Sequence, residues 1–325
     1  MVEVLSKLPA PGHDWVDRRL GPLEDACVFR PDGAGRSLVL TLDVITPIVD
    51  DPHAFGGIAA VNAMSDVYAM GGRPELALSF AGFPTDELGT QVLEQILAGA
   101  HEACARAGCA IVGGHTLVDT EPKCGLAVVG SVDPQHVWSQ RLARPGQALV
   151  LTKPLGTGLV GQAVRAGTVE PGLLAAATAQ MLQLNDTAAE VGRKRGATAC
   201  TDVTGFGLLG HLRHLVEAAG LEARLCASAV PLIDGVLPLA RSGCVPGGTR
   251  RNLKYASACT DFEDAIDEAL RLVLADAQTS GGLLLCLPAD QAEAAVAELR
   301  ATGCTRAAFV GELLGGERPA IHVRA

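Results

Sequence analysis

The chain has 325 residues, of which 48% are hydrophobic, only 3% are aromatic and 38 are glycine. This length allows two domains with ample core, and the composition excludes a disordered or fibrous chain and favours an α/β or α+β enzyme. The formal charge of −10 excludes a nucleic-acid partner held by counterion release, so we expect any bound nucleotide to be held by metal ions and backbone N–H groups.

The cysteines and the chain start bear on localisation. Ten cysteines are scattered without a C-x-x-C pair, which indicates neither a zinc knuckle nor a thioredoxin-type site. Most lie in apolar segments and are interpreted as small core hydrophobes. The sequence shows no leader pattern at its start and no apolar run that could span a bilayer. We therefore expect a reduced, soluble, cytoplasmic protein without a membrane partner.

Residues 1–24 are expected to be coil because prolines interrupt them. Glu24 and Asp25 then precede a short strand that ends at Phe29. A longer strand is predicted at 38–45, where the residues are apolar and β-branched.

A helix is predicted from Ala54 to Met70, ending at Gly71-Gly72. Asn62 and Asp66 are four residues apart, so they share one stripe of this helix with small and apolar residues. A carboxylate and an amide are costly to bury there unless something pairs with them. The alternative is that the stripe faces solvent or that Asp66 meets an arginine.

The rest of the first half alternates strands and helices. The predicted order is a strand at 76–83, a helix at 85–107, a strand at 109–112, a glycine-rich loop at 113–116 and a strand at 125–132. Ala143-Arg144-Pro145-Gly146 is the best domain boundary. It divides the chain into an N-terminal domain, 1–145, and a C-terminal domain, 146–325.

The second half opens with a strand at 148–152. It continues with helices at 158–166 and 171–193, a strand into 200–204, a helix to 219, loops at 246–252 and 276–282, a strand at 283–287 and a helix at 290–301. Helices and strands are mixed irregularly in both halves, which favours an α+β fold over a strict βαβ array.

Two G-x-G-x-x-G matches occur, at Gly156/Gly158/Gly161 and at Gly205/Gly207/Gly210. Neither is followed by a second strand that ends in an acid, so close packing of helix on strand explains them better than dinucleotide binding. No P-loop motif is present. His211 and His214 are three apart on a predicted helix, and we interpret them as a surface or hydrogen-bonded pair because nothing nearby completes a metal site.

Four acids are more informative: Asp25, Asp43, Asp66 and Asp202 lie at strand ends or inside apolar elements. If they converge, each pair at about 5 Å repels by roughly 3 kcal/mol at an effective dielectric constant near 20. Mg²⁺ would relieve that repulsion and would also bind substrate phosphates, while the loop at 113–116 could offer N–H groups to them. The pattern predicts metal-dependent ATP chemistry without a P-loop.

Several blocks of the sequence match one known family. The blocks are 24–28, 46–52, 62–72, 113–116 with Glu121-Pro122, 151–156, 201–211, 246–249 and 278–282. From about residue 20 to the C-terminus the chain resembles selenophosphate synthetase (selenide, water dikinase). Aminoimidazole ribonucleotide synthetase and thiamine-monophosphate kinase, which share the wider fold, share only fragments of this set.

The resemblance implies a PurM-like two-domain α+β fold and a homodimer in which the N-terminal halves form a shared β-barrel beside ATP. It implies synthesis of selenophosphate, AMP and phosphate from selenide, ATP and water. The implied Mg²⁺ ligands are Asp25, Asp66 and Asp202. Asp43 and Asp66 would contact ATP directly or through metal. The residues implied to line the nucleotide are Pro22, Leu23, Glu24, Gly114, His115 and Thr116.

Three departures from the family pattern stand out. Glu24 replaces the usual Asp, and Ala277 replaces the usual Pro before Gln278. The family's glycine-rich segment, which contains a Cys or selenocysteine and an essential Lys, has no match here. Lys7 resembles that lysine only in its local sequence pattern, so no catalytic residue is assigned. We expect an in-frame selenocysteine or cysteine codon upstream of Met1. Without the glycine-rich segment, we expect the chain to bind ATP but to make little selenophosphate. The alternative is a non-catalytic nucleotide-binding relative or regulatory subunit.

Overall fold

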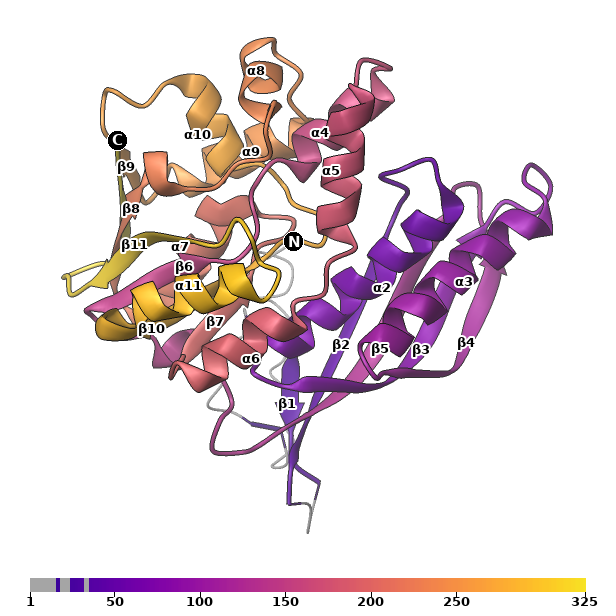
Figure 1. Ribbon diagram of the computed structural model, residues 1–325, viewed down its shortest axis with the longest axis horizontal. Helices are drawn as coiled ribbons and strands as arrows, with labels where there is room; N and C mark the ends of the chain where they lie inside the picture. Colours follow the sequence, from indigo (N-terminus) through magenta and orange to yellow (C-terminus); the bar gives the residue numbers. More distant parts are fainter. Residues whose placement is uncertain (1–15, 18–23, 32–34) are drawn as a thin grey trace.

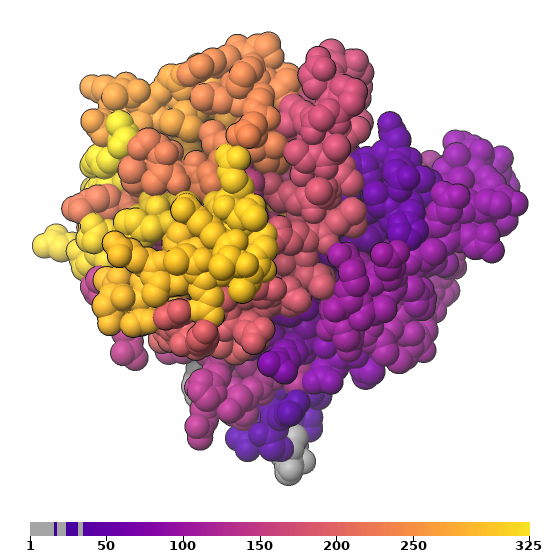
Figure 2. Space-filling model, viewed as in Figure 1, coloured from indigo at the N-terminus to yellow at the C-terminus, as the bar shows by residue number. Residues whose placement is uncertain are grey.

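The computed structural model describes residues 16–17, 24–31 and 35–325, which form two sheets with helices packed around them (Figure 1). A five-stranded sheet has the order β1-β2-β5-β3-β4, and a seven-stranded sheet has the order β7-β10-β6-β11-β8-β12-β9. Figure 2 shows the indigo-to-purple N-terminal part packed against the rest of the chain. The predicted α+β fold is confirmed. In the described ranges, no helix combines the length and apolar character needed to cross a membrane.

The first sheet comprises β1 (Cys27–Phe29), β2 (Ser37–Ile45), β3 (Arg73–Phe83), β4 (Ala110–Val118) and β5 (Lys123–Val132). Helices α2 (Pro52–Ala69) and α3 (Thr90–Arg106) lie side by side on one of its faces (Figure 1). The two helices approach so closely that a Cβ at Gly56 would lie 1.8 Å from the Ile96 carbonyl oxygen. Asp51 caps α2 by accepting a hydrogen bond of 2.6 Å from the Ala54 N–H.

The opposite face of the first sheet is apolar and exposed. In the register, Leu40 and Leu76 both pair with Val129, and Leu42 and Leu78 both pair with Ala127, so these leucines share one face. Their exposed fractions are 42% for Leu40, 45% for Leu76, 64% for Leu42 and 51% for Leu78. No described element covers this face.

The second sheet comprises β6 (Gln147–Leu151), β7 (Ala199–Asp202), β8 (Glu222–Cys226), β9 (Thr260–Phe262), β10 (Leu283–Pro288), β11 (Ala308–Leu314) and β12 (Ala320–Arg324). The helices of this part are α4 (Thr157–Arg165), α5 (Pro171–Met181), α6 (Asp186–Lys194), α7 (Gly207–Ala219), α8 (Val236–Arg241), α9 (Gly247–Ala256), α10 (Glu268–Leu274) and α11 (Ala292–Ala301). A short 3₁₀ helix, Gln140–Leu142, precedes β6.

Both faces of the second sheet are covered. In β10, Leu283 and Leu285 join the core shared with α2, α6 and α11, whereas Leu284 and Cys286 join the core formed with α4, α7 and α10. Because side chains alternate between faces and both faces are buried, the strand is a continuous apolar run.

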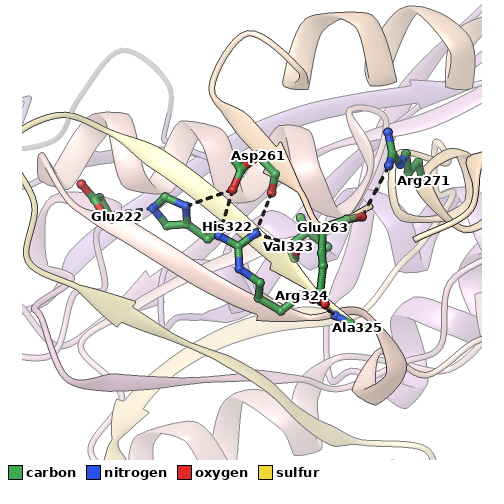
Figure 3. Close-up of polar contacts among 8 residues, drawn as sticks. All are labelled: Glu222, Asp261, Glu263, Arg271, His322, Val323, Arg324 and Ala325. Carbon is green, nitrogen blue, oxygen red and sulfur yellow. Dashed lines mark hydrogen bonds and ion pairs between the residues drawn. The ribbon is translucent and has the colours of Figure 1, made fainter. Parts of the chain in front are cut away.

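The end of the chain is inserted between two earlier strands. β12 runs parallel to both β8 and β9. Its His322 lies between Glu222 on β8, at 3.1 Å, and Asp261 on β9, at 3.8 Å (Figure 3). Arg324 donates a hydrogen bond of 2.8 Å to the same Asp261 carboxylate, so polar contacts link the three strands.

The helix predicted at 171–193 is wrong in one respect, because the structure divides it into α5 and α6. At the break, side chains from distant parts of the chain donate hydrogen bonds to the backbone carbonyl groups. Ser280 Oγ donates to the Met181 carbonyl at 2.6 Å, and Lys153 Nζ donates to the Gln183 carbonyl at 2.7 Å. The helix predicted at 85–107 begins only at Thr90.

Two predicted loops are also wrong. Residues 113–116 belong to β4, which pairs along β3, and Gly114 allows the strands to approach, since a Cβ there would lie 2.2 Å from the Ser79 carbonyl oxygen. Most of 246–252 lies in α9. The first turn of α9 is anchored by Thr249, whose hydroxyl donates to the buried Asp276 carboxylate at 2.7 Å.

Candidate active site

The four acids come from four separate places in the chain. Asp43 lies near the end of β2, Asp66 lies within α2, Asp202 ends β7, and Asp25 precedes β1. Helix α2 contacts both β2 and β7 and therefore brings the two sheets' acids together. The charge of Asp66 interacts with those of Asp202, Asp43 and Asp25.

Burial and mutual repulsion disfavour the charged forms of these acids. Burial and then the charge of Asp202 raise the pKa of Asp25 well above its usual value. Burial, followed by the charges of Asp202, Asp43 and Asp25, does the same to the pKa of Asp66. Burial raises the pKa of Asp202 to about 6 and also raises the pKa of Asp43. The cluster has too much negative charge for its surroundings.

Two oxygen atoms of this cluster lack partners. Oδ2 of Asp25 and Oδ2 of Asp202 are buried and accept no hydrogen bond from the described part of the chain. The other oxygen of Asp25 accepts from the Thr201 hydroxyl at 2.9 Å. Buried carboxylate oxygens are rarely left in this state, and a hard cation is the partner that their chemistry favours.

The donor set fits Mg²⁺ better than a metal that needs a complete protein cage. Within the described ranges, no three His, Cys, Asp or Glu side chains lie close enough to form such a cage. Mg²⁺ commonly uses one or two carboxylates and completes its shell with water and substrate phosphates. Oxygen-only ligands with unpartnered atoms at Asp25 and Asp202 suit that open arrangement.

Asp43 and Asp66 are held by neighbouring polar groups. Asn62, one turn before Asp66, donates from Nδ2 to Asp43 at 2.7 Å and accepts at Oδ1 from the Ser280 N–H at 2.8 Å. The Thr41 hydroxyl donates to Asp66. The predicted polar stripe of α2 is therefore buried and paired, and the solvent-facing alternative is wrong.

Three further residues near the acids, Ser65, Lys153 and Asn185, were not singled out in the sequence analysis. Ser65 lies close enough to Asp202 to offset part of the rise that burial causes in the pKa of Asp202. Asn185 Nδ2 donates to the Ser65 hydroxyl oxygen at 2.9 Å and to the Gly281 carbonyl at 2.9 Å. Lys153 is 1% exposed and donates to the Ser280 carbonyl at 3.0 Å. Burial lowers the pKa of Lys153 to about 7. The only sequence signal for these residues is that Ser65 and Lys153 lie in matched blocks, 62–72 and 151–156.

The residues expected at the nucleotide are not all near the acids. Glu24 accepts hydrogen bonds from the Ser139 hydroxyl at 2.5 Å and the Gln140 N–H at 3.2 Å. Pro22, Leu23 and Lys7 lie outside the described residues.

Gly114, His115 and Thr116 lie on exposed β4, at the opposite end of the strand order from β1. Three strand spacings, about 14 Å, separate β4 from the Asp43 strand β2. The structure of one chain therefore does not bring this group to the acid cluster.

Both helical histidines are buried and hydrogen-bonded. The ring of His211 lies 3.2 Å from the Thr201 hydroxyl and accepts from the Thr204 N–H at 3.1 Å. His214 lies 3.1 Å from the Tyr255 hydroxyl. The hydrogen-bonded alternative is confirmed and the surface alternative is wrong. Through Thr201, which also bonds Asp25, His211 helps to fix the acid cluster.

The glycines of the two G-x-G-x-x-G matches are explained by packing. A Cβ at Gly158 would lie 2.3 Å from the Ala277 carbonyl oxygen, and one at Gly161 would lie 2.5 Å from the Ile48 side chain. Gly207 has φ of +70°, a left-handed conformation that favours glycine.

Comparisons with known proteins define the class first. Residues 23–132 match the family model "AIR synthase related protein, N-terminal domain", and residues 144–324 match "AIR synthase related protein, C-terminal domain". The structure of this chain resembles that of thiamine monophosphate kinase from Aquifex aeolicus with a TM-score of 0.67 at 18% identity. The match covers 93% of this chain and 92% of that chain. The structure also resembles that of hydrogenase maturation protein HypE in complex with ATP, with a TM-score of 0.68 at 23% identity. That match covers 94% of this chain and 87% of the HypE chain. The fold is PurM-like.

Curated relatives narrow the class. The chain is 46% identical over 302 residues to the selenide, water dikinase of Myxococcus xanthus, covering 92% of this chain and 85% of the relative. It is 38% identical over 317 residues to that of Clostridioides difficile, covering 97% and 90%. The chain belongs to the selenide, water dikinase family.

Proposed function

We propose that this protein makes selenophosphate, AMP and phosphate from selenide, ATP and water, with Mg²⁺ as the required cation. Family membership supports the reaction. The structural observation that carries the proposal is the pair of unpartnered buried oxygens on Asp25 and Asp202 inside a cluster of acids with raised pKa values. A relative without catalytic activity would gain nothing from sustaining this repulsion.

The proposed metal ligands are Asp25, Asp66 and Asp202. Because no three acids of the described chain lie close enough to hold one ion together, we propose that one or two of them contact each Mg²⁺ and that water and ATP phosphates complete its shell. Bound Mg²⁺ would neutralise phosphate charge and polarise the phosphoryl group, which is the main demand of phosphoryl transfer. The protein's part is to hold the carboxylates in place: Thr41 orients Asp66, and Thr201 orients Asp25.

Asp43 is proposed to contact ATP directly or through the metal. Asn62 holds it at 2.7 Å and also holds the loop before β10 through the Ser280 N–H at 2.8 Å. Asn62 therefore links Asp43 on the first sheet to the backbone of the loop that leads into the second sheet.

We propose a homodimer formed through the first sheet. Its uncovered face exposes Leu40, Leu42, Leu76 and Leu78, and contiguous apolar surface of this kind marks an interface. The edge strand β4 also has paired neighbours on one side only in the described part of the chain. Gly114, His115 and Thr116, distant from the acids of their own chain, would serve the nucleotide of the partner subunit.

Mixing two inactive variants tests the dimer proposal. Asp66→Asn and His115→Ala homodimers should each be inactive, while subunit exchange should restore about a quarter of the wild-type sites, because half the dimers are mixed and each has one intact site. A monomer by light scattering, or no recovery on mixing, would contradict a shared site.

The cytoplasm is the proposed location. All ten cysteines are free, and Cys104, Cys109, Cys124, Cys200, Cys286 and Cys304 are buried, which suits a reducing compartment.

Product analysis tests the reaction itself. Anaerobic incubation with ATP, Mg²⁺ and selenide, followed by ³¹P NMR, should show selenophosphate, AMP and phosphate accumulating together. The matched control is Asp202→Asn, which should form none. ADP as the final nucleotide, or AMP formation that ignores selenide, would contradict the proposal.

A further inference from the structure

A basic pocket lies at the other end of β2 from the acid cluster. It has a volume of about 420 Å³, and its lining includes Arg36, Arg73, Ser131, Asp133, His136 and Arg193. Arg36 immediately precedes β2, and Asp43 follows seven residues later along the extended strand, a separation of about 23 Å. The pocket therefore shares no residue with the proposed active site.

Three chain segments supply its arginines: Arg36 before β2, Arg73 at the start of β3, and Arg193 in α6. Arg36 is partly neutralised, since it lies 3.7 Å from Glu75 and donates to Ser131 at 3.3 Å. Among the described residues, Arg73 has neither a hydrogen bond nor an ion pair from its side chain, and the side chain of Arg193 donates only to the Gly71 carbonyl, at 3.1 Å.

Acidic groups around the pocket are already engaged. Asp133 pairs with His136 at 3.0 Å, and Glu75 accepts from the Ser131 hydroxyl at 2.5 Å. Glu190 is close enough to act on Arg193, but burial and the positive charge of Arg73 outweigh it and lower the pKa of Arg193. Two guanidinium groups thus repel each other across a pocket of a chain whose net charge is −10.

We propose that this pocket binds a small phosphate-type oxyanion, either inorganic phosphate or the phosphate of a phosphomonoester, through Arg73 and Arg193 with Arg36 at the rim. Guanidinium groups offer planar, paired N–H donors that match phosphate oxygens. Arg193 uses one donor on Gly71 and has others available. The volume of about 420 Å³ exceeds what a phosphate ion fills, so the pocket also has room for the organic part of a phosphomonoester.

Calorimetric titration of the full chain with inorganic phosphate tests the site. EDTA is present and ATP and Mg²⁺ are left out, so the result does not depend on the proposed active site. We expect binding that weakens with added salt and that falls at least tenfold in Arg73→Gln and further in Arg73→Gln/Arg193→Gln. The matched control is Arg165→Gln, an exposed arginine at the end of α4, which should bind phosphate like wild type.

Arg73→Gln is the deciding variant, because its side chain makes no hydrogen bond or ion pair within the described structure whose loss could disturb folding. Circular dichroism melting confirms that each variant is folded. Competition by AMP that disappears in Arg73→Gln would identify a phosphomonoester ligand; phosphate binding without such competition would identify the free anion. Absence of phosphate and AMP binding at millimolar concentration, or equal phosphate affinity in Arg73→Gln and wild type, would overturn the proposal.

Discussion

Replacing Asp202 by Asn should stabilise the metal-free protein. Asp202 is 1% exposed, and its pKa is raised to about 6. The pKa of an aspartate in the unfolded chain is near 3.9, so the pKa rises by about two on folding. This rise costs about 3 kcal/mol of folding free energy at neutral pH. The Asn amide leaves an unsatisfied N–H in place of the unpartnered Oδ2, which costs about 1 to 2 kcal/mol. The net gain is about 1 to 2 kcal/mol, or a few degrees in Tm.

The pH dependence has a definite sign. Below the unfolded pKa the carboxylic acid is protonated in both states and Asp202 costs nothing. The cost grows as pH rises from about 4 to about 6 and is constant above that range, because the folded state binds the proton more tightly. The stabilisation by Asp202→Asn should therefore be full near pH 7 and much smaller near pH 4.5.

Thermal melting in EDTA measures this effect. The matched control is Asp264→Asn, an exposed aspartate, which should leave Tm unchanged. Adding Mg²⁺ should raise Tm of the wild type more than that of Asp202→Asn, because only the former keeps the carboxylate. A folded Asp202→Asn protein that melts at or below the wild-type temperature in EDTA at neutral pH would refute the reasoning.

Two other substitutions test contacts that helix α2 makes. Asn62→Ala should lower kcat/KM and cost about 1 to 3 kcal/mol of stability, because it leaves the Ser280 N–H and Asp43 without their partner. Steady-state kinetics measure the first effect and a urea titration measures the second. Unchanged values of both would contradict the proposal that Asn62 connects the two sheets. Gly56→Ala should prevent folding or cost several kcal/mol, since its Cβ would lie 1.8 Å from a carbonyl oxygen of α3. Gly172→Ala, with nothing within 4 Å, is its control and should be neutral or stabilising; equal Tm changes for the two would contradict the packing argument.

Local patterns predicted most elements of the fold. The helix predicted at 54–70 is α2 within two residues, because Pro52 and Gly71 mark its ends. The errors arose where distant contacts decide the outcome. The local sequence of 171–193 does not show that Lys153 and Ser280 donate hydrogen bonds to the carbonyl groups of Gln183 and Met181. These hydrogen bonds lie where the helix is interrupted.

Residue chemistry singled out the four acids, but their convergence needed the fold. Asp25 and Asp202 are separated by most of the chain and meet only because α2 joins the two sheets. Ser65 and Asn185 were missed because a Ser or Asn inside a helical pattern has no local mark of its partner. His115 illustrates the opposite case, since its block matches a family pattern yet lies on the far edge of the sheet.

The central claim is that the acid cluster is a Mg²⁺-dependent ATP site, and calorimetric titration of the wild type with ATP tests it most directly. Binding should require Mg²⁺, should disappear in Asp25→Asn, Asp66→Asn and Asp202→Asn, and should persist in Asp264→Asn. ATP binding of wild-type affinity in EDTA, or in the three folded site variants with Mg²⁺ present, would contradict the claim.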